Sequence, residues 1–289
     1  MNIQWYPGHM SKTKKLIMEN LKLVDIIIEL VDARIPYSSK NPNIDELSKH
    51  KPRIIVMNKS DLADENVTSK WVDWFKNQGY GVVVINSITG KGISTVYDLA
   101  KKMLKEKIEK DKKRGRIFRP IRAMVVGIPN VGKSTFINKL VGKASAKTGD
   151  RPGITKGKQW IKIKKDFELL DTPGILWPKF EDVNVGIKLA FTGAIKQEIL
   201  DIQTLSLKLL DFLSKNFPNN IKNRYKITDI SFKTSTELLK EIGLKRGFLI
   251  SGGEVDYDRT SQILLDELRS GKLGNITFEI PEDIEEKNE

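Results

Sequence analysis

The stretch Gly127-Ile128-Pro129-Asn130-Val131-Gly132-Lys133-Ser134-Thr135 decides the fold. It follows an apolar run over residues 123–126 and precedes apolar residues at helical spacing over residues 136–141. A strand, a glycine-containing loop and a helix in this order match the phosphate-binding loop G-x-x-x-x-G-K-[ST]. The glycines let the backbone approach a phosphate closely, so that several N–H groups and the positive end of the following helix converge on its oxygens.

Positions within this P-loop carry separate expected roles. Lys133 reaches the β- and γ-phosphates, which also makes it a predicted catalytic residue, and Ser134 holds Mg²⁺. Asn130 matches an asparagine that in some GTPases helps to bind K⁺, an ion that can replace a catalytic arginine electrostatically. A K⁺ requirement is therefore a hypothesis, which equal hydrolysis in Na⁺ and K⁺ would contradict. The loop residues expected to contact the nucleotide are Asn130, Val131, Gly132, Lys133, Ser134 and Thr135.

A second motif, Asn58-Lys59-Ser60-Asp61, ends a β-branched run over residues 54–57 and fits N-K-x-D. Its carboxylate can accept hydrogen bonds from guanine N1–H and the exocyclic amine, whereas adenine has no such amine and would leave Asp61 unpaired. We expect Asn58 to bind the base and brace the P-loop, and the stem of Lys59 to pack on the ring. Asn86-Ser87, after a third run, would add backbone contacts to the guanine oxygen. The predicted ligand is GTP.

A third motif, Asp171-Thr172-Pro173-Gly174, fits D-x-x-G. Asp171 would hold Mg²⁺ through water, and the Gly174 N–H would bind the γ-phosphate. Thr155, in a glycine-containing segment before this motif, is the candidate that closes the Mg²⁺ shell, although a threonine there could also be a simple turn residue. Ras-like enzymes follow D-x-x-G with a glutamine that orients the attacking water. Ile175 stands there instead, so the catalytic group must come from elsewhere.

Apolar β-branched runs alternate with helical patterns up to residue 171, which predicts an α/β fold with a doubly wound, mostly parallel sheet. Ligands bind at the carboxyl ends of such strands, where all three motifs fall. Their order is unusual, because N-K-x-D and the Asn86-Ser87 segment precede the P-loop, whereas in Ras-like chains N-K-x-D follows D-x-x-G. Joining the old termini and cutting the chain between D-x-x-G and N-K-x-D gives this order, a circular permutation.

The domain organisation follows from where these patterns stop. Helical spacing replaces the strand pattern after Pro178, with stops expected at Pro218 and Gly271. Expected helices cover residues 185–195, 199–217, 236–242 and 259–268. The predicted segments are an arm and basic helix (1–22), the permuted GTPase domain (23–180), a small all-α domain (181–280) and an acidic, disordered tail (281–289).

The charge distribution indicates a polyanionic partner. The formal net charge is +13, and all of the excess falls in residues 1–182. Nucleic acid fits better than a membrane, since no basic amphipathic segment with aromatic anchors stands out. A lysine-rich surface that merely favours solvation is the alternative. Residues 101–122 hold eleven Lys or Arg against three acids, as either a solvated connector or an RNA-facing element.

The absence of cysteine excludes disulfides and thiolate metal sites and is compatible with a reducing cytosol. No stretch approaches the length of a membrane span, and the first residues have neither an apolar signal core nor the bias of a transit peptide. We therefore expect a cytoplasmic protein.

Taken together, the motifs resemble the ribosome biogenesis GTPase A family (RbgA, also called YlqF), which are circularly permuted GTPases. The likeness also includes the arm Trp5-Tyr6-Pro7-Gly8-His9-Met10 and Asp32-Ala33-Arg34, and it leaves out only the acidic tail. It implies GTP hydrolysis stimulated by the large ribosomal subunit during late assembly, and an rRNA-binding C-terminal domain in a cytoplasmic setting, with no membrane or DNA partner. Because the C-terminal part is slightly acidic, local patches such as Lys222, Arg224 and Lys226 would have to bind RNA.

The same resemblance favours His9 as the catalytic group, carried into the site on the N-terminal arm. His9 could instead cap the following helix or contact RNA, and the other histidine, His50, lies in a Lys-rich turn expected at the surface. Arg151 could reach the transferring phosphate or contact RNA. An alternative function is a GTP-gated RNA-binding regulator that does not act on the ribosome; much faster hydrolysis with ribosomal particles than with naked RNA would favour the assembly factor.

Overall fold

The computed structural model describes residues 18–48, 50–115, 119–142, 159–171, 182–195 and 201–285. These residues fall into two compact units, each described by itself below. The sheet unit holds the described residues up to 171 together with 277–285, and the helical unit holds residues 182–195 and 201–276.

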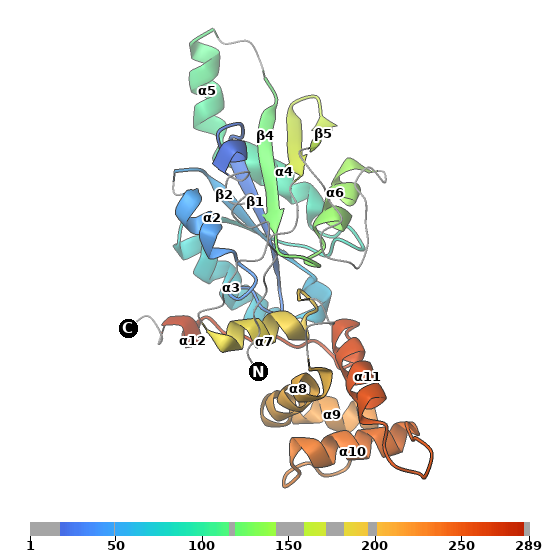
Figure 1. The fold of residues 1–289 in the computed structure, drawn as a ribbon. Helices are drawn as coiled ribbons and strands as arrows, with labels where there is room; N and C mark the ends of the chain where they lie inside the picture. Colours follow the sequence, from blue (N-terminus) through green and yellow to red (C-terminus); the bar gives the residue numbers. More distant parts are fainter. Residues whose placement is uncertain are drawn as a thin grey trace. The chain divides into compact units, whose positions relative to one another are not determined.

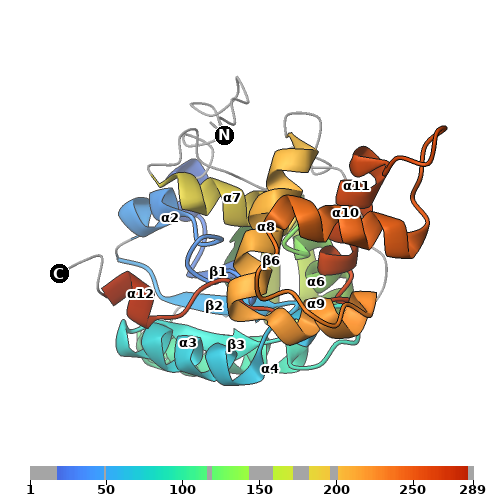
Figure 2. The same ribbon diagram turned by 90° about the horizontal axis from the view of Figure 1, so that it is seen from below.

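The sheet unit is built on six strands in the order β3-β2-β1-β4-β6-β5. Figure 1 labels β1, β2, β4 and β5, and Figure 2 labels β3 and β6. All neighbouring pairs are parallel except β5 with β6. This confirms the predicted α/β class with a mostly parallel sheet. The strands are β1 (Ile26–Asp32), β2 (Arg53–Asn58), β3 (Gly81–Val84), β4 (Ile121–Gly127), β5 (Gln159–Lys164) and β6 (Phe167–Asp171).

The central strand β1 is buried along its whole length, as expected of a β-branched run in a parallel sheet with both faces covered. Its residue Ile27 packs in a cluster with Ile44 of α2, and Val31 packs in another cluster with Trp71 and Phe75 of α3. The helical elements of the sheet unit, other than the C-terminal helix described next, are α2 (Pro42–Leu47), η1 (Ser60–Leu62), α3 (Glu65–Asn77), α4 (Ile93–Met103), α5 (Lys105–Lys113) and α6 (Lys133–Val141).

Residues 277–285, named the C-terminal segment here, pack against the sheet unit. The backbone N–H of Phe278 donates to the carbonyl of Arg34 (2.8 Å), and the indole N–H of Trp71 donates to the carbonyl of Glu279 (2.9 Å). The segment ends in α12 (Glu282–Glu285) beside α3, as Figures 1 and 2 both show. There Ile284 is buried in the same cluster as Trp71.

This packing corrects one prediction. The acidic composition of residues 281–289 predicts a disordered tail, but Glu282–Glu285 forms the helix α12. The physical reason is Ile284, which is only 6% exposed and supplies apolar burial that a composition argument overlooks. Residues 286–289 lie outside the described part of the chain.

The helical unit has a leucine-rich core. Leu205, Leu209 and Leu213 line the buried face of α8, as its spacing predicts. Pro218 does not simply stop this helix: it occupies the first turn of a further helix, where its missing N–H costs nothing. The helices are α7 (Val183–Phe191), α8 (Ile202–Asn216), α9 (Pro218–Tyr225), α10 (Ser235–Arg246) and α11 (Tyr257–Arg269).

One buried carboxylate ties three of these helices together. Glu267 of α11 accepts hydrogen bonds from Arg224 and from the Tyr225 hydroxyl (2.8 Å) of α9, and from Arg246 of α10. Burial raises the pKa of Glu267, but the hydrogen bonds from Arg224 and Tyr225 and the two guanidinium charges outweigh it and hold the pKa below its ordinary value. Glu267 therefore remains an anion at neutral pH.

Candidate nucleotide-binding site

The predicted motifs meet at one edge of the sheet because the strands that carry them are parallel. Asp32, the last residue of β1, pairs in register with Asn58 at the end of β2. On the other side of β1, Leu30 pairs with Gly127, where the P-loop begins. The next strand contributes Asp171, whose backbone pairs with Val125. N-K-x-D, P-loop and D-x-x-G thus begin at the carboxyl ends of β2, β4 and β6, along one edge of the sheet.

Asn58 connects the N-K-x-D loop and the Asn86-Ser87 loop, together called the base-side loops, to the P-loop. Its side chain is fully buried, with Nδ2 donating to the carbonyl of Val131 (2.7 Å) and Oδ1 accepting from the backbone N–H of Ser87 (3.0 Å). Asn58 ends β2, whereas Ser87 and Val131 lie in the loops that follow β3 and β4. One amide group therefore fixes the spacing between the N-K-x-D loop, the Asn86-Ser87 loop and the P-loop.

The P-loop conformation explains why Gly132 is a glycine. Its φ is +94°, and a Cβ at this position would lie 2.3 Å from Nδ2 of Asn58. Asn130 also has a positive φ, of 57°. Gly132 is the N-cap of α6, so that Lys133 begins the helix and is 6% exposed, while Ser134 and Thr135 are half-buried. A helix therefore begins at Lys133, and the first turn of a helix is where anions bind to backbone N–H groups.

The base-side loop places two further predicted residues. Lys59 adopts a left-handed conformation, with φ 61° and ψ 36°, and occupies the N-cap position of the short helix η1. Asp61 lies in η1 with an exposed side chain. The Ser60 N–H donates to the carbonyl of Ile85 (3.3 Å), which holds this loop against the end of β3. The side-chain oxygen of Asn86 accepts from the N–H groups of Ile88 (2.9 Å) and Thr89 (3.0 Å), so it shapes its own turn.

A buried ionic cluster at the same edge was not assigned a role from the sequence. Asp32 and Arg34 are each 1% exposed, and the Asp32 carboxylate accepts from Nε (2.9 Å) and Nη2 (2.7 Å) of Arg34. Lys59 Nζ lies 3.0 Å from the same carboxylate. Burial raises the pKa of Asp32, but the charges of Arg34 and Lys59 outweigh it and hold the pKa far below its ordinary value. The sequence feature that could have indicated this cluster is the pair Asp32 and Arg34, at the end of the central buried strand.

Several predicted residues lie outside the described residues: His9, Arg151, Thr155, Gly174 and Ile175, together with the side chain of Asp171. His50 is exposed, as expected. Within the described ranges no group of three or more His, Cys, Asp or Glu side chains is arranged to hold a metal ion. Also within those ranges, no helix is both long enough and apolar enough to cross a bilayer.

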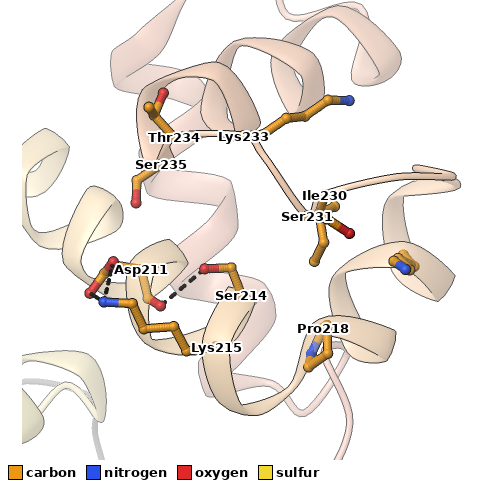
Figure 3. A pocket seen from close by; sticks show the side chains of 10 residues that line it. Asp211, Ser214, Lys215, Pro218, Ile230, Ser231, Lys233, Thr234 and Ser235 are labelled. Carbon is orange, nitrogen blue, oxygen red and sulfur yellow. Dashed lines mark hydrogen bonds and ion pairs between the residues drawn. The ribbon is translucent and has the colours of Figure 1, made fainter.

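The helical unit has a cavity of its own, of about 460 Å³ (Figure 3). Lys215 pairs there with Asp211 (2.8 Å), and Thr234 and Ser235 belong to the start of α10. Of the three residues named for RNA binding, Lys222 lines the cavity, but Arg224 is engaged by Glu267. The lining residues are Asp211, Ser214, Lys215, Pro218, Lys222, Ile230, Ser231, Lys233, Thr234 and Ser235.

Two family models match the chain. One, described as an RsgA GTPase, matches residues 11–181, and the other, described as a 50S ribosome-binding GTPase, matches residues 122–241. The first covers the N-K-x-D, P-loop and D-x-x-G motifs in the order in which they occur here.

Relatives resemble the chain along its whole length. Ribosome biogenesis GTPase A of Bacillus cereus is 52% identical over 100% of this chain and 97% of its own length. Its counterpart from Thermotoga maritima is 35% identical over 98% and 96%. Among solved structures, GDP-bound TM YlqF gives a TM-score of 0.70 at 29% identity, covering 93% of this chain and 100% of that one. GNP-bound YlqF from T. maritima gives 0.66 at 30%, covering 94% and 99%.

The fold, the site and the motif order define a P-loop GTPase with circularly permuted motifs, an enzyme that binds and hydrolyses GTP. Within this class, the chain belongs to the ribosome biogenesis GTPase A family.

Proposed function

We propose that this GTPase acts as an assembly factor in late maturation of the bacterial large ribosomal subunit, binding rRNA in a cytoplasmic setting. Nucleotide binding is supported by the two side-chain hydrogen bonds of Asn58, which join N-K-x-D, the Asn86-Ser87 loop and the P-loop. The ribosomal part is supported by the names of the relatives, ribosome biogenesis GTPase A, and by the 50S ribosome-binding GTPase model.

For the nucleotide, we assign guanine to the base-side loops. Asp61 accepts from N1–H and the exocyclic amine, the stem of Lys59 packs on the ring, and backbone N–H groups of Asn86 and Ser87 contact the guanine oxygen. The exposed side chain of Asp61 supports this role, because a ligand can reach it. The phosphates bind to the P-loop N–H groups, Lys133 and the Gly174 N–H.

For the metal, we assign Mg²⁺ to Ser134, Asp171 and Thr155. Hydroxyl and carboxylate oxygens are the ligands that Mg²⁺ prefers, and the half-buried Ser134 at the start of α6 fits this chemistry. The pairing of Asp171 with Val125 of the P-loop strand also supports the assignment. When bound, Mg²⁺ neutralises charge that develops on the phosphate oxygens. Asn130 is our candidate contact for K⁺.

For catalysis, we propose that His9 orients the attacking water. The support is chemical: Ile175, which stands in place of the Ras-type glutamine, can neither donate nor accept a hydrogen bond. Lys133 and Thr155 complete the catalytic set by stabilising charge on the transferring phosphate.

For the RNA partner, the net charge of +13 favours a polyanion. Lys222, which lines the cavity of the helical unit, supports a phosphate-contacting role for that unit, whereas Lys215 and Lys233 pair with Asp211 and Glu241. Phe232, next to this cavity in sequence and 95% exposed, is available to stack on an unpaired base.

The experiment is GTP turnover at fixed salt with purified large ribosomal subunits or naked RNA of similar charge, for the wild type and His9→Ala. We expect subunits to stimulate the wild type far more than naked RNA does. His9→Ala should bind subunits but lose about 100-fold or more of the stimulated rate, the usual contribution of a positioned catalytic group. Stimulation of neither protein by subunits, with GTP-dependent binding of free RNA, would replace the assembly factor by an RNA-binding regulator.

A further inference from the structure

The ionic cluster around Asp32 contains more positive charge than the carboxylate needs. Arg34 alone neutralises it with two side-chain hydrogen bonds, at 2.9 and 2.7 Å, and a third from its backbone N–H at 3.1 Å. Lys59 then adds a second cation at 3.0 Å, although its side chain is 23% exposed and its amino group could be hydrated. Charge balance therefore does not explain why the Lys59 amino group lies here.

The backbone at Lys59 gives a reason. Its left-handed conformation, with φ 61°, is one that residues with a Cβ rarely adopt, so the loop needs contacts that hold it. The ion pair with Asp32 fixes the far end of the side chain, and the Ser60 N–H bond to Ile85 fixes the following peptide. Directly after these two contacts the chain forms η1, which carries Asp61.

Asp32 is itself rigidly held. It is the last residue of the central strand, its backbone N–H donates to the hydroxyl of Ser39 (2.9 Å), and its carboxylate is locked by Arg34. The carbonyl of Arg34 in turn accepts from the N–H of Phe278 in the C-terminal segment. Lys59 is thus tied to a residue that is fixed by both its backbone and its side chain.

We propose that Asp32 is a positioning residue for guanine recognition, which holds the Lys59 side chain in place for the base and presents Asp61 to it. This inference rests on the proposed guanine-binding role of the base-side loops. It assigns Asp32 no contact with the phosphates, which bind at the P-loop on the other side of β1. Loss of Asp32 should therefore weaken nucleotide binding without slowing hydrolysis of bound GTP.

The test compares Asp32→Asn with the wild-type full-length chain, using a fluorescent GDP for binding and GTP turnover for kinetics. Asparagine keeps the shape but not the charge, so the Lys59 amino group loses its anchor. We expect Kd for GDP and KM for GTP to rise by about tenfold or more, the scale of one charge-assisted hydrogen bond, with kcat unchanged. A purely structural role would lower the melting temperature but leave KM unchanged.

The chain offers a matched control at the opposite end of the same strand. Asp25 directly precedes β1, is 7% exposed and pairs with Lys107 and Arg119, each at 2.6 Å. Asp25→Asn removes another buried, doubly paired carboxylate, at the end of β1 away from the nucleotide motifs. It should lower stability as Asp32→Asn does, yet leave Kd within about twofold, because distant sites act independently.

Two further variants keep the test decisive. Lys59→Met removes the amino group, and in that background Asp32→Asn should add no further loss of affinity, since the coupling between them is the effect itself. If Asp32→Asn does not fold, Asp32→Glu keeps the charges paired but moves the amino group, and it should raise KM alone. Additive losses, or an Asp32→Asn protein with the affinity of Asp25→Asn, would overturn the inference. Failure of the proposed guanine site itself would appear separately, as a wild type that does not prefer GDP over ADP.

Discussion

At the scale of single residues, Asn58 explains how motifs far apart in sequence become one site. Its two hydrogen bonds reach 73 positions along the chain to Val131 and 29 positions to Ser87. Position 132 must be a glycine because any Cβ there would collide with the Asn58 amide. The order of the motifs along the chain is therefore immaterial to the site: contacts of this kind, and not sequence order, set the geometry.

We predict that Asn58→Ala destabilises the sheet unit by about 1–3 kcal/mol, because it leaves a buried carbonyl and a buried N–H unpaired. It should also raise KM for GTP, since the P-loop loses its brace. The measurement is urea unfolding together with GTP turnover. Asn216→Ala is the control: its exposed amide bonds only the carbonyl of Phe212 within α8. Equal stability of the two variants would contradict the role assigned to Asn58.

At the scale of elements, the C-terminal segment is the part of the fold for which amino-acid composition gives the wrong expectation. Glu279 is 2% exposed, and its carboxylate accepts from the backbone N–H groups of Tyr37 (2.8 Å) and Ser38 and from the Ser38 hydroxyl. Lys70 pairs with Glu282 nearby (2.7 Å), although both side chains are largely exposed. Glu279 and Ile284, and not the surface ion pair, attach this segment to the sheet unit.

We predict that Glu279→Gln destabilises the sheet unit by about 1–3 kcal/mol, because its NH₂ group must face donors that now bond to a carboxylate oxygen. Glu285→Gln, an exposed residue at the end of α12, is the matched control and should change stability by less than about 0.5 kcal/mol. Urea unfolding followed by tryptophan fluorescence measures both, since Trp71 donates to the Glu279 carbonyl. The account of this segment would fail if both substitutions had the same small effect.

At the scale of the whole molecule, the sequence was informative wherever a local pattern carries a physical requirement. Apolar runs that end in Asn58 and Gly127, together with the hairpin pattern that ends in Asp171, predicted both the mostly parallel sheet and the shared edge of the site. The contact of Asp32 with Lys59 could not be predicted, because it depends on the register of β1 against β2 and on a left-handed backbone at Lys59.

The remaining differences have equally local causes. The helix after Pro218 was missed because proline both ends one helix and favours the first turn of the next. The engagement of Arg224 by Glu267 was missed because ion pairs between helices are not visible in a charge count. The P-loop glycine was expected from the close approach of the backbone to a phosphate, and the structure gives two further reasons for it, its positive φ and the approach of Asn58.

The central claim is that the permuted motifs build one guanine-specific site, and Asp61→Asn tests it most directly. Guanine presents two donors to this position, whereas xanthine presents one donor and a carbonyl oxygen, which an asparagine amide matches better than a carboxylate does. The measurement is competition by GTP and XTP for the wild type, Asp61→Asn and the exposed control Asp73→Asn. The account predicts that only Asp61→Asn loses GTP affinity, by about 100-fold, and gains preference for XTP. An Asp61→Asn protein that still prefers GTP as strongly as the wild type would contradict it.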